Sequence, residues 1–185
     1  MKNKESTIPR EWTKVRLGEV AFVTNGKTNT QDAVIDGEYP LFDRSVLIKR
    51  SNKYLFDKEV IILPGEGADF IPKYFKGKFD LHQRAYAIFA KDDKIYLPYL
   101  YQYLFFNRYI FAQKAVGSTV KSLRLPIVQN IQVNVPPISE QKKIAEILAC
   151  VDKDIEKTDE IIKNTQKLKN GLMQDLLSGE VRVKI

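Results

Sequence analysis

The sequence predicts a mixed α+β fold, in which a β-rich globular domain, residues 1–136, precedes one long coiled-coil-forming helix and a short tail, residues 137–185. Short apolar runs separated by Gly, Pro and Asn steps fill the chain up to about residue 89, as in β-rich domains. Helical spacing of apolar residues appears between residues 97 and 112, and an unbroken aliphatic repeat follows the double proline at 136–137. A length of 185 residues suits one ordinary domain with an extension.

The expected strands are short and bounded by turn residues. Asn25-Gly26 follows the first strand, and Pro64-Gly65-Glu66-Gly67 closes a compact apolar run. We expect strands at Val15–Val23, Tyr39–Phe42, Val46–Ile48, Val60–Leu63, Lys73–Phe79, Ala85–Phe89 and Asn130–Val135.

A first helix is expected from Leu97 to about Ala112. Pro98 suits the first helical turn, and apolar residues recur at spacings of three and four. The helix is rich in Tyr and Phe, which can stack on nucleic-acid bases, but aromatic side chains at helical spacing more often pack in a core. We therefore expect core packing here, with a small polar loop, Gly117–Thr119, after the helix.

The second helix is the longest element that the sequence predicts. Pro136-Pro137 stops the last strand, Ser139 is a suitable N-cap, and Glu140 with Gln141 fits the first turn. With Gly179 as its end, the helix covers about 38 residues and about 57 Å, and Gly171 is a candidate kink. A 4-3 repeat, called the seam below, runs along it: Ile144, Leu148, Val151, Ile155, Thr158, Ile162, Thr165, Lys169, Leu172 and Leu176.

The seam predicts a partner helix. Seven of its ten positions are aliphatic, and the polar members Thr158, Thr165 and Lys169 are of the kind that fixes register and partner number. A helix of this length has little in the chain to lie against. The alternative is a helix that folds back over its own domain.

The net positive charge comes entirely from the first 136 residues. They hold 21 Lys and Arg against 14 Asp and Glu, whereas residues 137–185 hold nine of each. No acidic residue occurs between Lys94 and Ser139. Such a one-sided surface suits a polyanion, because contacts to phosphates release condensed counterions, although a solvated basic face without a ligand has the same composition.

No credible active site is found in the sequence. Asn134-Val135-Pro136-Pro137 lacks the aromatic residue of the Asn-Pro-Pro-Tyr loop of amino-methyltransferases, and no Gly-rich cofactor loop accompanies it. One histidine and one cysteine, Cys150, exclude a His/Cys zinc cluster and an internal disulfide. We expect no catalytic residue, no metal and no cofactor. No apolar run approaches membrane-spanning length and the N-terminus is not signal-like, so we expect a cytoplasmic protein without membrane contact.

The helical region resembles that of type I restriction-modification specificity subunits. The similarity lies in Pro136-Pro-Ile-Ser-Glu-Gln-Lys-Lys-Ile-Ala-Glu-Ile-Leu148 and in Gly171-Leu-Met-Gln-Asp-Leu-Leu-Ser-Gly-Glu-Val-Arg-Val183. Leu63-Pro-Gly-Glu-Gly67, His82-Gln-Arg84 and Gly117-Ser-Thr119 resemble the target recognition domain of that family. The resemblance implies a noncatalytic DNA reader that binds methyltransferase subunits and, through them, the restriction motor subunit. Members typically hold two recognition domains and two helical regions, so this chain resembles a half-subunit.

One domain and one helix per chain predict a symmetric pair. A twofold axis perpendicular to the helices pairs them antiparallel and puts one recognition domain near each end. The expected partner is therefore a second copy, and the expected DNA target is an interrupted palindrome. If both domains approach the same face of the DNA, its half-sites lie about 34–36 Å apart.

The DNA-binding residues are expected in loops of the first domain. Arg and Gln have the two-pronged geometry that reads guanine and adenine edges, whereas Lys, Ser and Thr suit phosphates. The candidates for loop contacts are Lys27, Thr28, Asn29, Arg44, Lys49, Arg50, Lys53, His82, Gln83 and Arg84. The candidates for phosphate contacts are Lys114, Ser118, Thr119, Lys121 and Arg124.

Two other functions fit parts of the sequence. A coiled-coil adaptor or anti-restriction decoy would bind the methyltransferase without reading DNA, against which the charge asymmetry argues. The recognition module of a fused restriction enzyme would have its catalytic part elsewhere.

Overall fold

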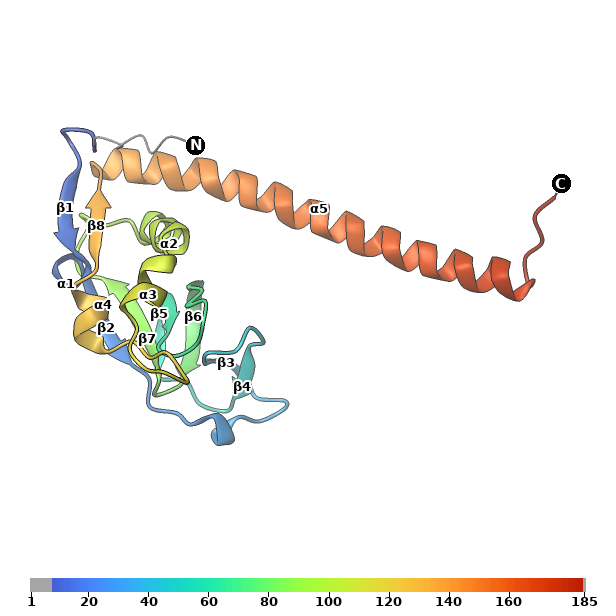
Figure 1. Ribbon diagram of the computed structural model, residues 1–185, viewed down its shortest axis with the longest axis horizontal. Helices are drawn as coiled ribbons and strands as arrows, with labels where there is room; N and C mark the ends of the chain where they lie inside the picture. The colour runs from blue at the N-terminus through green and yellow to red at the C-terminus, as the bar shows by residue number, and fades with distance from the viewer. Residues whose placement is uncertain (1–7, 185) are drawn as a thin grey trace. The chain divides into compact units, whose positions relative to one another are not determined.

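The computed structural model describes residues 8–184, and their contacts divide the chain into two compact units at residues 145 and 146 (Figure 1). The first unit holds all the strands and four short helices, and the second is formed by the long helix α5 beyond Ala145 and the residues after it. The prediction of an α+β fold with a long C-terminal helix is confirmed. Most of the N-terminal segment that we interpreted as not signal-like lies outside the described residues.

A six-stranded sheet forms the centre of the first unit. Its spatial order is β2-β7-β5-β6-β3-β4, and every neighbouring pair is antiparallel except β3 and β6. The strands are β2 (Ala21–Asn25), β3 (Tyr39–Phe42), β4 (Lys49–Ser51), β5 (Phe56–Pro64), β6 (Lys73–Leu81) and β7 (Ala85–Ala90).

The central strand β5 is buried on both faces. Ile61 and Leu63 belong to a large core that also contains the helices, while Val60 and Ile62 belong to a second, smaller core of mostly aromatic and aliphatic residues. All four side chains are fully buried. This explains why the strand reads as a continuous apolar run and not as an alternating one.

The aromatic region folds as two helices and not as one. α2 (Leu97–Phe106) packs against β5 and β6, and α3 (Tyr109–Lys114) follows after Asn107, whose side-chain amide and backbone N–H both donate to Tyr103 O. The predicted continuous helix to about residue 112 is therefore wrong at this break. Leu97, Tyr99, Leu100, Leu104 and Phe111 are buried, as expected for core packing, but Phe106 and Tyr109 are exposed.

The predicted strand Val15–Val23 is wrong in its middle. The chain forms β1 (Thr13–Arg16), a single helical turn α1 (Leu17–Val20) and then β2, and the helical turn buries Leu17 completely. β1 pairs with β8 (Gln132–Val135) in a separate two-stranded antiparallel sheet, so the turn allows one segment to serve two sheets (Figure 1).

Two further expectations are corrected. Val46–Ile48 is not a strand but an exposed bend before β4, and an unpredicted helix, α4 (Leu125–Gln129), begins with Pro126 in its first turn. A short 3-10 turn, η1 (Thr30–Asp32), follows the first loop.

The helix α5 (Ile138–Ser178) has 41 residues. Its first turns belong to the first unit, because the side chain of Gln141 is fully buried, accepts from Tyr96 N and donates to Lys94 O and Pro136 O. Ser139 lies inside the helix and is not its N-cap, since Pro137 O already accepts from Gln141 N. The helix continues through Gly171 without a break and ends before Gly179, whose φ is +79°. No helix among residues 8–184 has both the length and the apolarity needed to cross a membrane.

Candidate nucleic-acid interface

Loops from separate parts of the chain meet at one end of the sheet. The turn between β6 and β7 lies beside the loop that follows β2, where Thr28 and His82 form an isolated bridge. Gln83 N donates to Thr28 O at 3.0 Å, and His82 N donates to Phe42 O at 2.9 Å. Three loops distant in sequence are thus joined through their backbones, which gives the side chains on them fixed starting points.

A buried carboxylate stabilises this junction of loops through hydrogen bonds. Asp80 is 1% exposed and accepts from Thr28 Oγ1 at 2.7 Å, from Ser51 Oγ at 2.9 Å and from Leu81 N at 2.9 Å. Hydroxyl and amide donors thus satisfy the buried carboxylate oxygens, as buried polar groups require. Thr28, a candidate for DNA contact, is itself 2% exposed with its hydroxyl bound to Asp80, so its position supports the loop and does not face solvent.

Gly26 is needed for the same junction. A Cβ atom built on it would lie 2.0 Å from Leu81 O, closer than any real contact. The loop can therefore approach the end of β6 only with glycine at this position.

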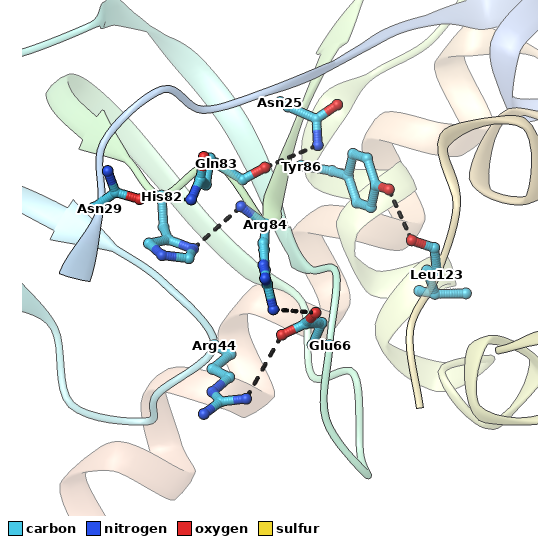
Figure 2. Close-up of polar contacts among 9 residues, drawn as sticks. All are labelled: Asn25, Asn29, Arg44, Glu66, His82, Gln83, Arg84, Tyr86 and Leu123. Carbon is cyan, nitrogen blue, oxygen red and sulfur yellow. Dashed lines mark hydrogen bonds and ion pairs between the residues drawn. The ribbon is translucent and has the colours of Figure 1, made fainter. Parts of the chain in front are cut away.

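Glu66 is the acidic residue at the centre of the candidate interface (Figure 2). Arg84 Nη1 donates to its Oε1 at 2.9 Å, and Arg44 Nη1 lies 3.6 Å from its Oε2. The Glu66 side chain is only 15% exposed, whereas those of Arg44 and Arg84 are 61% and 62% exposed. The carboxylate therefore holds two guanidinium groups from different loops while both remain open to solvent.

Polar side chains of the turn between β6 and β7 are also held in place. Gln83 Nε2 donates to Asn29 Oδ1 at 2.5 Å, and Asn25 Nδ2 donates to Gln83 O at 3.2 Å (Figure 2). Arg84 N donates to His82 Nδ1 at 3.1 Å, which requires that this ring nitrogen carry no proton. Burial lowers the pKa of His82 below its ordinary value, so the neutral ring is favoured near pH 7.

These side chains surround a hollow of about 290 Å³. Its lining includes Asn29, Asp43, Arg44, Glu66, His82, Gln83 and Arg84. Thr30 and Gln31 complete the lining, and five of the nine residues were predicted from the sequence. The lining is predominantly polar and combines two-pronged donors with amide groups, the chemistry that reads base edges.

The basic loop after β3 is only partly available. Lys49 Nζ forms an ion pair with Asp43 Oδ2 at 2.7 Å, and Arg50 donates to the backbone carbonyls of Gly37 and Glu38. Burial alone raises the pKa of the Asp43 carboxyl, but hydrogen bonds from Lys49 and Ser45 outweigh it and hold the pKa below the ordinary value. Lys49 and Arg50 thus have structural roles in the free protein.

The second group of basic residues is anchored to the hollow through its backbone. Gly67 N donates to Lys121 O at 3.1 Å, Leu123 N donates to Gly65 O at 2.8 Å, and Tyr86 Oη donates to Leu123 O at 2.8 Å (Figure 2). The 65–67 loop is therefore shared by the hollow and the 114–124 segment. The exposed side chains of this segment include Lys114, Ser118, Thr119, Lys121 and Arg124, together with Val116 and Val120.

Three structural residues of the site were missed from sequence. No local sequence pattern marks Asp80 or Asp43 as a structural residue. The hydroxyl partners of Asp80 are distant in sequence, and a bend in the chain brings the partners of Asp43 within reach. Glu66 was visible within the Leu63–Gly67 motif, but its two arginine partners were not assigned to it. An acidic residue flanked by two glycines in a basic surface is the signal that could have found it.

The seam on α5 is exposed from Leu148 onward in the part of the chain that the structure describes. Leu148, Val151, Ile155, Ile162, Leu172 and Leu176 are 39–60% exposed. Thr158 and Thr165 are also exposed and donate to helix carbonyls four residues earlier, and Lys169 is exposed. Ile144 differs, because it is half-buried and packs against the core of the first unit. An apolar stripe of this length normally has a protein partner.

Comparison with known proteins identifies the family. Residues 9–164 match the model of the type I restriction modification DNA specificity domain. The chain belongs to this family. It is 30% identical over 178 residues to the type I restriction enzyme EcoDI specificity subunit of Escherichia coli. It is 26% identical over 186 residues to the MjaVIII specificity subunit of Methanocaldococcus jannaschii.

Solved structures show the same fold for this specificity-domain chain. The S subunit of a type I restriction-modification system from M. genitalium matches with a TM-score of 0.75 at 20% identity, covering 96% of this chain and 48% of that one. The HsdS subunit from Thermoanaerobacter tengcongensis matches with a TM-score of 0.60 at 14% identity, covering 92% and 46%. The present chain also spans 39% and 44% of the two curated relatives, which is less than half of their length.

Proposed function

We propose that this chain is the sequence-specific DNA-recognition subunit of a type I restriction-modification system, without catalytic activity of its own. The hollow formed by Asn29, Arg44, Glu66, Gln83 and Arg84 is the observation that carries the proposal. It brings together side chains suited to base edges, on loops that hydrogen bonds to Asp80 and between their backbones hold in place. Membership in the specificity-domain family supports the same function.

Base reading is assigned to the exposed Arg44, Gln83 and Arg84 and to the partly exposed Asn29. Arg44 and Arg84 have the fork geometry that binds guanine O6 and N7, and Gln83 and Asn29 carry amides that match adenine N6 and N7. His82 is less exposed and mainly shapes the turn through its bond to Arg84 N. Sequence preference therefore depends on a few side chains whose backbones are held rigidly.

Phosphate contacts are assigned to exposed basic and hydroxyl-bearing residues outside the hollow. They set the orientation of the DNA and supply the salt-dependent part of the affinity without reading sequence. These residues are Lys27, Lys53, Lys114, Ser118, Thr119, Lys121 and Arg124, and all seven are exposed.

Two copies pair through the seam of α5. An antiparallel pair is a closed arrangement that buries the stripe of both helices, and its twofold axis, perpendicular to the helices, puts one reader near each end. The target is then an interrupted palindrome with half-sites about 34–36 Å apart.

The paired helices also dock methyltransferase subunits, and through them the restriction motor subunit, in the cytoplasm. The outer faces of α5 are strongly charged and leave room for such docking beside the seam. The names of the relatives, which are specificity subunits of restriction enzymes, support this assignment.

Electrophoretic mobility shifts test DNA binding by the purified chain. Mixed-sequence DNA at low and moderate salt should give a complex that weakens steeply as salt increases. A coiled-coil adaptor or decoy that binds only the methyltransferase would give no shift at either salt concentration. A subsequent footprint should show two protected half-sites, and protection of a single continuous site would contradict the paired reader.

A further inference from the structure

We propose that the tail after α5 of one copy, Val181–Lys184, docks in an acidic groove of the second copy at the start of its α5. The groove occupies about 510 Å³. This inference rests on the proposed pairing of two chains and adds a second contact to it. The proposed occupant of the groove is therefore Val181–Lys184 of a second copy of this chain.

The register of the seam leads to the groove. An antiparallel pair brings together all ten seam positions when Leu148 faces Leu172 and Val151 faces Lys169, because the 4-3 spacing is symmetric about its centre. The same register brings Ile144 level with Leu176. A shift by one heptad leaves apolar seam residues at both ends without a partner. The full-overlap register therefore brings the tail of each chain to the beginning of the other chain's helix.

The groove lies at that beginning. Its apolar wall is the segment Val135–Ile138, which includes the double proline and the first residue of α5. Its charged residues are Glu11, Asp92 and Asp93 on the acidic side and Lys94 on the basic side. Three carboxylates against one ammonium leave the groove net negative in an otherwise basic unit.

The tail has matching chemistry. It lacks regular secondary structure, and its valines Val181 and Val183 are 52% and 71% exposed. They alternate with Arg182 and Lys184, so an extended tail presents valines to one side and positive charges to the other. The valines suit the wall at Val135–Ile138, and the basic residues suit the carboxylates opposite.

Geometry also permits the contact. α5 ends at Ser178, so the helical part of the register brings that residue level with Lys142 of the second copy. Val181 N donates to Asp175 O at 3.0 Å, so the tail leaves the helix beside its last turn. Residues 182–184 in extended conformation reach about 10 Å from there, which exceeds the roughly 6 Å of helix between Lys142 and Ile138 of the second copy. Charge complementarity and register thus select the second copy as the occupant.

Cysteine cross-linking between two differently labelled chains tests the contact. Both chains carry Cys150→Ser, and one carries Glu11→Cys while the other carries Val183→Cys. Mixing them and adding a short bismaleimide should give a covalent heterodimer. Asp57→Cys, an exposed acidic position on β5 outside the groove, should not cross-link to Val183→Cys. A mixture of Leu148→Cys and Leu172→Cys chains reports the seam register separately.

A charge exchange provides the second measurement. Glu11→Lys with Asp93→Lys should raise the dimer dissociation constant about tenfold, since symmetry removes four exposed ion pairs together. Adding Arg182→Glu and Lys184→Glu to the same chain should restore the affinity. The tail contact is overturned if the chains cross-link between positions 148 and 172 but not between 11 and 183, and if the charge exchange leaves the dimer dissociation constant unchanged. The pairing through the seam would still stand. A chain that remains a monomer overturns both.

Discussion

The two units treat aliphatic side chains in opposite ways. In the first unit, Ile61, Leu63 and Leu100 are completely buried by the chain itself. In the second, Ile155 and Ile162 repeat along one stripe of α5 and remain 55% and 60% exposed. The first unit is complete as a folded domain, whereas the stripe of the second lacks a cover. The first unit thus exposes polar loops at one end of its sheet, whereas the second exposes an apolar stripe.

The polar groups differ in the same manner. At the end of the sheet, Glu66 and Asp80 bond to Arg84 and Thr28 and so join loops distant in sequence. In α5 beyond Ala145, Lys157 pairs with Asp154, and the side chains of Thr158, Thr165 and Gln166 form hydrogen bonds to residues four positions away. Polar bonds therefore build the site in one unit and only support the helix in the other.

The largest expected effect comes from charging the seam. Leu148→Asp with Leu172→Asp buries carboxylates at facing positions of the pair and should separate the chains, with at least about a hundredfold loss of affinity for a two-part DNA site. Sedimentation and mobility shifts measure both losses. Lys153→Asp, on the outer face, is the matched control and should leave the dimer intact. A charged seam with unchanged sedimentation would show that the stripe does not pair.

The next effect concerns the readers. Arg84→Ala should weaken binding to the preferred sequence about tenfold to a hundredfold and leave binding to unrelated DNA nearly unchanged. Competition assays with both DNAs measure the ratio. Lys121→Ala provides the contrast, because it should weaken both DNAs equally and lower the salt dependence by about one counterion. An equal loss on both DNAs for Arg84→Ala would remove it from base reading.

Glu66→Gln should change affinity and discrimination in opposite directions. Removing a negative charge beside the DNA strengthens binding to unrelated sequences about threefold, while the freed Arg44 and Arg84 lose their fixed orientation. Discrimination between preferred and unrelated DNA should therefore fall. Ser122→Ala, whose residue bridges the same loop through its backbone, is a control that should change neither quantity. Unchanged discrimination in Glu66→Gln would show that the carboxylate does not position the readers.

The smallest effect is a pH dependence of stability. The pKa of His82 is lowered by burial in the folded state, so the unfolded state binds more protons below the ordinary value of 6.5. The contribution of the neutral ring is therefore present above pH 6.5 and is lost as the pH falls through the lower folded pKa. Urea unfolding at pH 7.5 and 5.5 should show a decrease in stability that His82→Gln reduces. An identical decrease in both proteins would assign it to other groups.

The sequence predicted the helix better than it predicted the site. The seam extends over ten positions at regular spacing, so its helix was located to within a few residues. The helical turn at Leu17–Val20 has only four residues and no period to detect, and its apolar residues resemble those of the strands on either side. The contacts of Glu66 and Asp80 depend on residues 18 to 52 positions away, which local patterns do not encode. The side-chain chemistry of the loops predicted candidates for DNA contact. It could not distinguish exposed candidates from buried residues such as Thr28, which support the loops.

Selection of bound sequences from random DNA tests the central claim most directly. The purified chain should enrich two identical half-sites in inverted orientation, separated by a fixed number of base pairs that corresponds to about one helical turn between their centres. The Leu148→Asp, Leu172→Asp protein should enrich a single half-site or none. Enrichment of an asymmetric sequence or of one isolated half-site by the unaltered chain would contradict a symmetric pair of readers.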